Sequence, residues 1–289
     1  MEYLIHILVM AGLYVILTVS LNLVLGYAGL PAMGQSAFFC IGAYTSSLIC
    51  IHYGISPWIT LCLAAGLAGG AGWLISHTAS RLAGDFLALA TFGFAVVTHS
   101  LTANWSDVTR GPLGLSDISP FMFFEQRLDT AWAFFPLVAV CCFATVVVAR
   151  RLVDSPFGRI IQGMRESATI SISLGIDVGR YTRTVFTVGA FFAGIAGTLY
   201  AHYIMYIDPT SFTPMESVTI LLMVVFGGMG SIAGSISGAT TLVLLPEALR
   251  FIGLPSSMAA PVRQMLYGGI LVALMIVRPS GLLGRYKWR

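Results

Sequence analysis

The sequence has few charged side chains. Only 9% of its 289 residues are charged and 57% are hydrophobic, whereas a soluble domain carries about 25% charged residues. A chain of this composition has too little polar surface to cover itself in water, so we expect lipid to face most of it. The basic residues are scattered, without a dense stripe, and nothing in the composition points to nucleic-acid binding.

Lysine is almost absent. The only one is Lys287, close to the end of the sequence. A phosphate-binding loop of the type G-x-x-x-x-G-K-[ST] needs a lysine after its glycines. This chain therefore cannot form such a loop, and ATP hydrolysis, if the protein depends on it, must belong to another polypeptide. We accordingly expect no cofactor in this chain.

Catalytic and metal-binding motifs are also missing. The sequence has no H-E-x-x-H motif, and its five cysteines lie in apolar stretches without metal-ligand spacing. The segment Gly234–Gly238 does not fit G-x-S-x-G because its third residue is Ile236. We interpret its serines as small residues that let helices pack closely. We expect neither a catalytic nor a metal site, which argues against a membrane enzyme.

Long apolar runs fill the chain instead. A helix needs roughly 20 apolar residues to cross the hydrocarbon core, and about nine windows meet this length. Gly-rich breaks leave counts of eight to ten open. The polar segments between the windows are too short for a separate core, so we predict an all-α polytopic bundle and one membrane domain over residues 1–289. The windows are 3–25, 32–51, 57–79, 85–103, 131–149, 184–206, 216–233, 235–252 and 262–279.

Basic residues near span ends predict the orientation. Arginines concentrate in segment 150–183 and basic residues return at the end of the sequence, and such residues mark cytoplasmic loops. With nine spans, the N-terminus lies outside and the C-terminus is cytoplasmic. Segment 104–130 holds two arginines against four acidic residues, which fits the outer side. The cytoplasmic basic residues are Arg150, Arg151, Arg159, Arg165, Arg180 and Arg183, with Arg285, Lys287 and Arg289 in the tail.

Two Gly-rich breaks are candidates for the substrate path. Broken helices expose backbone donors and acceptors that transporters use to hold substrates. The alternative is a tight interhelical turn whose polar side chains are satisfied within the chain. The two breaks have similar sequences, an apolar pair followed by Gly-x-x-Gly. Either two related transporter halves or chance would explain this similarity. The candidate residues are Asn22, Gly26, Gly29, Gln35 and Ser36 at the first break, and Gly227, Gly228 and Gly230 at the second.

Segment 150–183 contains a predicted amphipathic helix over about 156–174. Ser155 suits the N-cap and Pro156 the first helical position. Apolar residues recur at helical spacing, with polar residues on the other side. Periodicity alone fits equally a helix in the lipid headgroups and a docking helix for a cytoplasmic motor. The candidate coupling residues are Pro156, Gly158, Arg159, Ile161, Met164, Arg165, Glu166, Ala168 and Ile172.

Seven segments, in order along the chain, resemble the branched-chain amino acid ABC permease family of the LivM/LivH kind. The length and TRGPLGL resemble its LivM branch. Cys40 departs from an expected glycine. The segments are GYAGLPAMGQSAFFCIGAY (26–44), TRGPLGL (109–115), SPFGRIIQGMRES with SLGID (155–177), FFAGIAGTLYA (191–201), VVFGGMGSIAGSISGA (224–239), LPEALR (245–250) and RPSGLLG (278–284).

The resemblance implies a permease of a binding-protein-dependent importer in the bacterial inner membrane. Its partners would be a second, LivH-like permease, two cytoplasmic ATPase subunits that bind ATP and Mg²⁺, and an extracytoplasmic binding protein. It also favours the docking interpretation of the predicted helix. Branched-chain amino acids are the implied cargo, with urea, short amides or other amino acids as alternatives. A stand-alone carrier or channel remains a competing class, although few acidic residues fall at mid-membrane.

Overall fold

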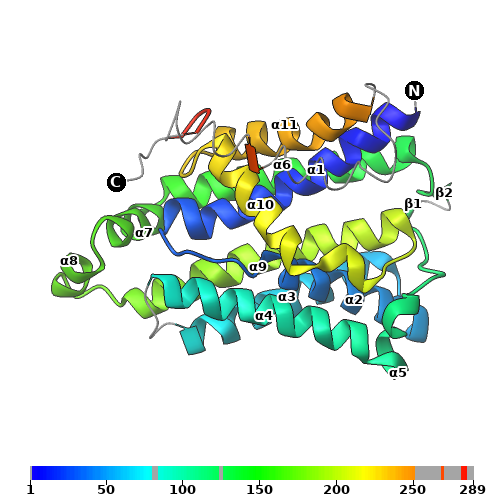
Figure 1. The fold of residues 1–289 in the computed structure, drawn as a ribbon, viewed down its shortest axis with the longest axis horizontal. Coiled ribbons are helices and arrows are strands. Elements are labelled where there is room, and N and C mark those ends of the chain that lie inside the picture. The colour runs from blue at the N-terminus through cyan, green and yellow to red at the C-terminus, as the bar shows by residue number, and fades with distance from the viewer. Residues whose placement is uncertain (1, 80–83, 124–125, 251–267, 270–280, 285–289) are drawn as a thin grey trace.

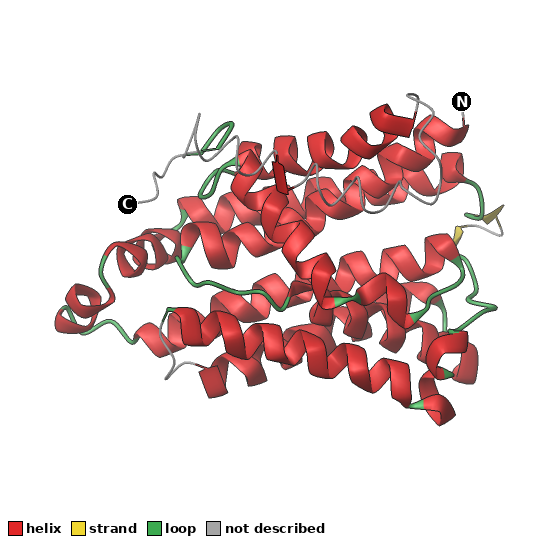
Figure 2. Cartoon of the chain, in the orientation of Figure 1, coloured by secondary structure: helices red, strands yellow, loops and turns green. Residues whose placement is uncertain are grey.

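The computed structural model describes residues 2–79, 84–123, 126–250, 268–269 and 281–284. Helices make up nearly all of this part of the chain, and the strands are confined to one short hairpin (Figure 2). This follows from the composition, because a helix satisfies its own backbone polar groups where water is absent. The hairpin pairs β1 (Met122–Phe123) with β2 (Gln126–Arg127) in antiparallel fashion.

In the part of the chain that the structure describes, six helices are long and apolar enough to cross a membrane. The first is α1 (Glu2–Asn22), which continues into the π-helical turn η1 (Leu23–Tyr27). Two further apolar helices follow late in the chain, α10 (Pro214–Gly227) and α11 (Ile232–Arg250), and the apolar part of α11 is Ile232–Leu245. The other long helices are α2 (Gln35–Tyr53), α3 (Pro57–Ala79), α4 (Asp85–Asn104), α6 (Ala131–Asp154) and α9 (Val178–Ile204).

The helices form two groups that share a core. Helix α9 packs along α3 and α2, whereas α1 packs against α6 and α11. In Figure 1, α2, α3, α4 and α9 lie in one group and α1, α6, α10 and α11 in the other. Contacts between α1 and α9 join the groups. Close approach within the first group depends on small residues, because a Cβ added at Gly194 would lie 2.6 Å from Ala68 Cβ.

Eight of the nine predicted spans overlap a described apolar helix. Window 3–25 corresponds to α1 with η1, and window 131–149 lies within α6. The prediction of one helix over 216–233 is wrong: α10 ends at Gly227, and Gly228 has a φ of 112° that other residues rarely adopt. The ninth window, 262–279, lies outside the described residues except for 268 and 269.

The connecting segments gather at the two ends of the bundle. Helices α7 (Pro156–Glu166) and α8 (Ala168–Ser173) project from one end, and the hairpin and α5 (Ser106–Thr109) lie at the other (Figure 1). At the hairpin end, Asp208 caps the short 3₁₀-helix η3 (Pro209–Phe212). Partial burial raises the pKa of its carboxyl, but hydrogen bonds from Thr210 and Ser211 outweigh this, so the pKa lies below its ordinary value.

Candidate functional site

The predicted coupling segment forms two helices rather than one. The Ser155 hydroxyl accepts a hydrogen bond from the Gly158 amide at 3.3 Å and caps α7, whose first residue is Pro156. The helix stops at Ser167, which is extended (φ −158°, ψ 107°) and caps α8 in turn. The prediction of a single helix to residue 174 is therefore wrong. The helix is interrupted because the Ser167 hydroxyl accepts a hydrogen bond from the Ile170 amide at 3.3 Å and so caps a new helix.

The apolar residues that recur along the predicted helix differ in their exposure to solvent. Ile161 is 1% exposed and Met164 6% exposed, and both are buried within this chain. Ala168 and Ile172 lie beyond the break and are exposed. The expectation that all four face a partner is thus wrong for Ile161 and Met164, which anchor α7 to the bundle.

The surface that α7 and α8 leave exposed is mixed in character. Pro156, Arg159 and Glu166 are exposed on α7, while Gly158 is buried. Around α8, three large apolar side chains are exposed in a run of five residues. Apolar side chains clustered at an exposed tip are typical of a contact surface. These residues are Ile170 (63% exposed), Ile172 (61%) and Leu174 (75%).

Arg165, one of the candidate coupling residues, faces the bundle. Its side chain is half-buried and its Nη1 donates a hydrogen bond to the Gly26 carbonyl at the first Gly-rich break. The aliphatic part of the side chain covers Gly29, where an added Cβ would lie 2.5 Å from Arg165 Cγ. Gly29 also has a φ of 69°, which favours glycine. One α7 side chain therefore contacts both glycines of the break.

Asn22 joins the first break to the second. Its Nδ2 donates to the Ser231 carbonyl at 3.0 Å and to Ser235 Oγ at 2.7 Å. Its Oδ1 accepts from the Gly230 amide at 3.0 Å. Asn22 is 1% exposed, so these bonds form away from solvent. The two breaks, some two hundred residues apart in the sequence, lie side by side.

The remaining glycines of the second break allow close backbone packing. A Cβ on Gly227 would collide with the Gly234 backbone, and one on Gly228 with Gly284. Residues 281–284 lie against the end of α10, where the Leu282 and Leu283 amides donate to the Phe226 and Gly227 carbonyls at 3.0 and 2.9 Å. Carbonyls at a helix end need such donors.

Gln35 and Ser36 are buried at the start of α2 and bonded within the chain. Gln35 Nε2 donates to Ser20 Oγ on α1. The Ser36 amide donates to Ser217 Oγ at 2.8 Å, and that hydroxyl donates to Ser36 Oγ at 2.7 Å. Together with Asn22, these side chains match the alternative interpretation, a turn whose polar groups are satisfied. Their contact with cargo stays a prediction.

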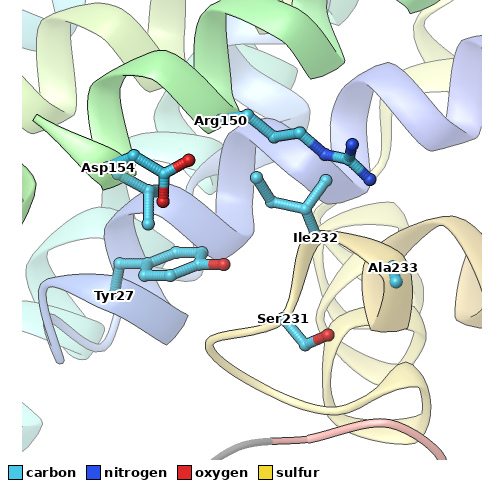
Figure 3. A pocket seen from close by; sticks show the side chains of 7 residues that line it. Tyr27, Arg150, Asp154, Ser231, Ile232 and Ala233 are labelled. Carbon is cyan, nitrogen blue, oxygen red and sulfur yellow. The ribbon is translucent and has the colours of Figure 1, made fainter.

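A cavity of about 280 Å³ lies next to both breaks. Figure 3 shows Arg150 and Asp154 extending into it from α6, the carboxylate on the side of Tyr27 and the guanidinium on the side of Ile232. None of the predicted path residues lines it, although Tyr27 follows Gly26 and Ser231 follows Gly230. Opposite charges four residues apart at a span end were the available sequence signal. The lining residues are Tyr27, Arg150, Val153, Asp154, Ser231, Ile232 and Ala233.

A second polar cluster, which the sequence analysis did not identify, lies near the hairpin end. His202 of α9 is fully buried; its Nε2 lies 2.6 Å from Ser46 Oγ on α2 and its Nδ1 lies 2.7 Å from the Ser119 carbonyl. This histidine ties the loop before the hairpin to the bundle. A lone histidine in an apolar span was the only signal. Within the described ranges, no group of three His, Cys, Asp or Glu side chains is placed to hold a metal ion.

The chain is a polytopic helical bundle in which two broken helices lie side by side and two short helices project from one end, an arrangement that fits a membrane permease. The family described as "Branched-chain amino acid transport system / permease component" matches residues 3–275, and the chain belongs to this family. It is the permease component of an ABC transporter and not itself an ATPase.

Several permeases are similar to the chain along most of its length. The high-affinity branched-chain amino acid transport system permease protein LivM of Salmonella typhimurium is 36% identical, over 96% of this chain and 69% of the relative. LivM of Escherichia coli is 36% identical over 94% and 68%. LivH of Escherichia coli is 24% identical over 94% and 91%. No solved structure matches the chain.

Proposed function

We propose that this chain is one of two permease subunits of a binding-protein-dependent importer, and that its cargo is a branched-chain amino acid. The observation that carries the proposal is the 36% identity to LivM over 96% of the chain. The scarcity of charge in the spans supports a neutral or zwitterionic cargo, because an ionic solute needs compensating charge in a low-dielectric path.

The proposed partners follow from the same family. A LivH-like permease would complete the membrane domain, two cytoplasmic ATPase subunits would supply the energy, and an extracytoplasmic binding protein would deliver the cargo. The arginine-rich segment 150–183 supports a cytoplasmic position for α7 and α8, with the N-terminus outside. The chain would then lie in the inner membrane of a bacterial cell.

Reconstitution tests the cargo and the energy source. The complex, rebuilt in proteoliposomes with its binding protein, is expected to take up leucine, isoleucine or valine only when ATP and both ATPase subunits are present. Uptake that persists without the ATPase subunits would identify a stand-alone carrier. Uptake restricted to urea or short amides would keep the machine and change the cargo.

We further propose that the exposed tip of α8, with the exposed face of α7, binds an ATPase subunit. Ile170, Ile172 and Leu174 provide an apolar surface without cover in the described part of the chain. The Ile172→Asp variant should abolish co-purification of the ATPase subunits, because a charge would be buried in an apolar contact. Ser173→Asp adds the same charge at a neighbouring exposed polar residue and is the matched control. Equal co-purification with both variants would contradict this docking surface.

The glycines at both breaks are proposed to line the substrate path in a different conformation. Asn22, Gln35 and Ser36 are bonded within the chain, so a contact with cargo requires those bonds to open. In a cysteine-free background, a Ser36→Cys variant should therefore react with a small thiol reagent during ATP-driven transport and not in the resting complex. Equal reactivity in both states would argue that Ser36 never leaves its bond with Ser217.

A further inference from the structure

We propose that Arg165 is a positioning residue that links α7 mechanically to both broken helices. A displacement of α7 would then move the first break, and Asn22 would carry that movement to the turn between α10 and α11. The inference rests on the proposed binding of α8 to an ATPase subunit. It goes further by naming the route by which that binding reaches the spans.

The first link is the contact between Arg165 and the break in the first span. The guanidinium donates to the Gly26 carbonyl at the end of η1, where a helix presents unsatisfied carbonyls and partial negative charge. A cation at such a position is stabilising, and arginine can donate without giving up its charge. The fit is also steric, because Gly29 leaves room for the Arg165 side chain.

The second link is the set of hydrogen bonds made by Asn22. It lies one turn before Gly26 and holds Gly230, Ser231 and Ser235. Gly26 and Gly230 are also in close steric contact, since a Cβ on Gly26 would lie 2.6 Å from the Gly230 amide nitrogen. The first break therefore cannot move toward the second without displacing it.

Close packing makes the connection stiff. Ile161 and Met164 fix the buried face of α7 in the bundle, so α7 cannot slide past the break without disturbing packed side chains. Packed contacts of this kind transmit strain, and neither Arg165 nor Asn22 lines the cavity beside the breaks. The two breaks are the elements that can change arrangement, since glycines with positive φ lie at both. Coupling between distant sites depends on an element with two arrangements, and Arg165 and Asn22 both contact these breaks.

The test compares uptake per ATP hydrolysed among arginine variants in proteoliposomes. Arg165→Gln removes the charged donor and should lower uptake per ATP on the order of tenfold, from the strength of a charged hydrogen bond. The ATPase subunits should still co-purify. Arg165→Lys can still reach toward the Gly26 carbonyl and should restore part of the coupling. Arg151→Gln, at an exposed arginine in the last turn of α6, should leave uptake per ATP unchanged.

A second variant tests the far end of the link and remains available if Arg165→Gln fails to assemble. Ser235→Ala removes one Asn22 bond and should lower uptake per ATP roughly threefold, as expected for one interhelical hydrogen bond. Combined with Arg165→Lys, the loss should be smaller than the product of the two single losses, because both act on one route.

The outcomes separate this inference from the docking proposal. If Ile172→Asp abolishes ATPase binding but the Arg165 and Ser235 variants keep the uptake per ATP of the native complex, the link through Arg165 is refuted. Independent losses that multiply in the double variant would refute it as well. If Ile172→Asp leaves ATPase binding intact, it is the docking surface that fails.

Discussion

Replacing Asn22 should destabilise the protein, because this one side chain makes three hydrogen bonds to the second break. Asn22→Leu keeps a similar volume but removes three hydrogen bonds to the Gly230, Ser231 and Ser235 groups. Interhelical hydrogen bonds in membranes average about 0.6 kcal/mol, so the three together contribute about 2 kcal/mol. For a chain of this size we expect the unfolding midpoint to fall by about 4–8 °C. Ser235→Ala, which removes one bond, should lower it by about 1–2 °C.

The assay is thermal unfolding of the purified complex in detergent at one fixed scan rate, since unfolding of membrane complexes is commonly irreversible. Asn104→Leu is the matched control. Asn104 is exposed and its side chain bonds only within its own helix, to the Ser100 carbonyl at 2.7 Å. Its replacement should change the free energy of unfolding by about 0.5 kcal/mol or less. Equal shifts for the two leucine variants would refute the assignment of Asn22 as the bridge between the breaks.

Three further predictions concern other parts of the chain. A cysteine replacing Ser173, in a cysteine-free background, should react with an impermeant reagent only from the cytoplasmic side. Reaction from outside alone would show that the orientation is the reverse of the predicted one. Gly29→Ala should destabilise the complex by more than Gly54→Ala, because both glycines have positive φ but only Gly29 lies against a side chain, that of Arg165; similar losses would show that backbone strain alone matters. Because the pKa of Asp208 is lower in the folded protein, its ionised carboxyl should stabilise the fold at pH values above the ordinary aspartate pKa. This stabilisation should be lost as the pH falls through the pKa of the folded state. The unfolding midpoint of Asp208→Asn should therefore depend less on pH in that acidic range, and an unchanged pH profile would contradict the capping role.

Local signals in the sequence predicted the helices well. Apolar length gave α1 with η1, α3 and α4 to within a few residues. The Ser155 cap and Pro156 marked the start of α7. These features depend on neighbours in the sequence, so a pattern is sufficient to find them. The same pattern reasoning placed Ile161 and Met164 on one face of a helix but could not tell what covers that face.

Long-range contacts were beyond such patterns. Nothing near Asn22 indicates that its partners lie about two hundred residues away in the second break, or that Arg165 reaches Gly26. The end of α7 at Ser167 was missed for a different reason. Serine tolerates a helix interior and also caps a helix, and only the fold decides between these uses.

The π-helical turn at Leu23–Tyr27 allows the helical register at the end of the first span to change. A π turn contains one residue more than an α turn. If it were rewound into α geometry, the end of the helix would shift by one position, about 100° around the axis and 1.5 Å along it. Helix α1 itself would not need to bend. A small local change at the start of the Gly-rich segment is therefore sufficient to shift the residues that directly follow the turn relative to α1, and a one-residue deletion within Leu23–Tyr27 would make that shift permanent.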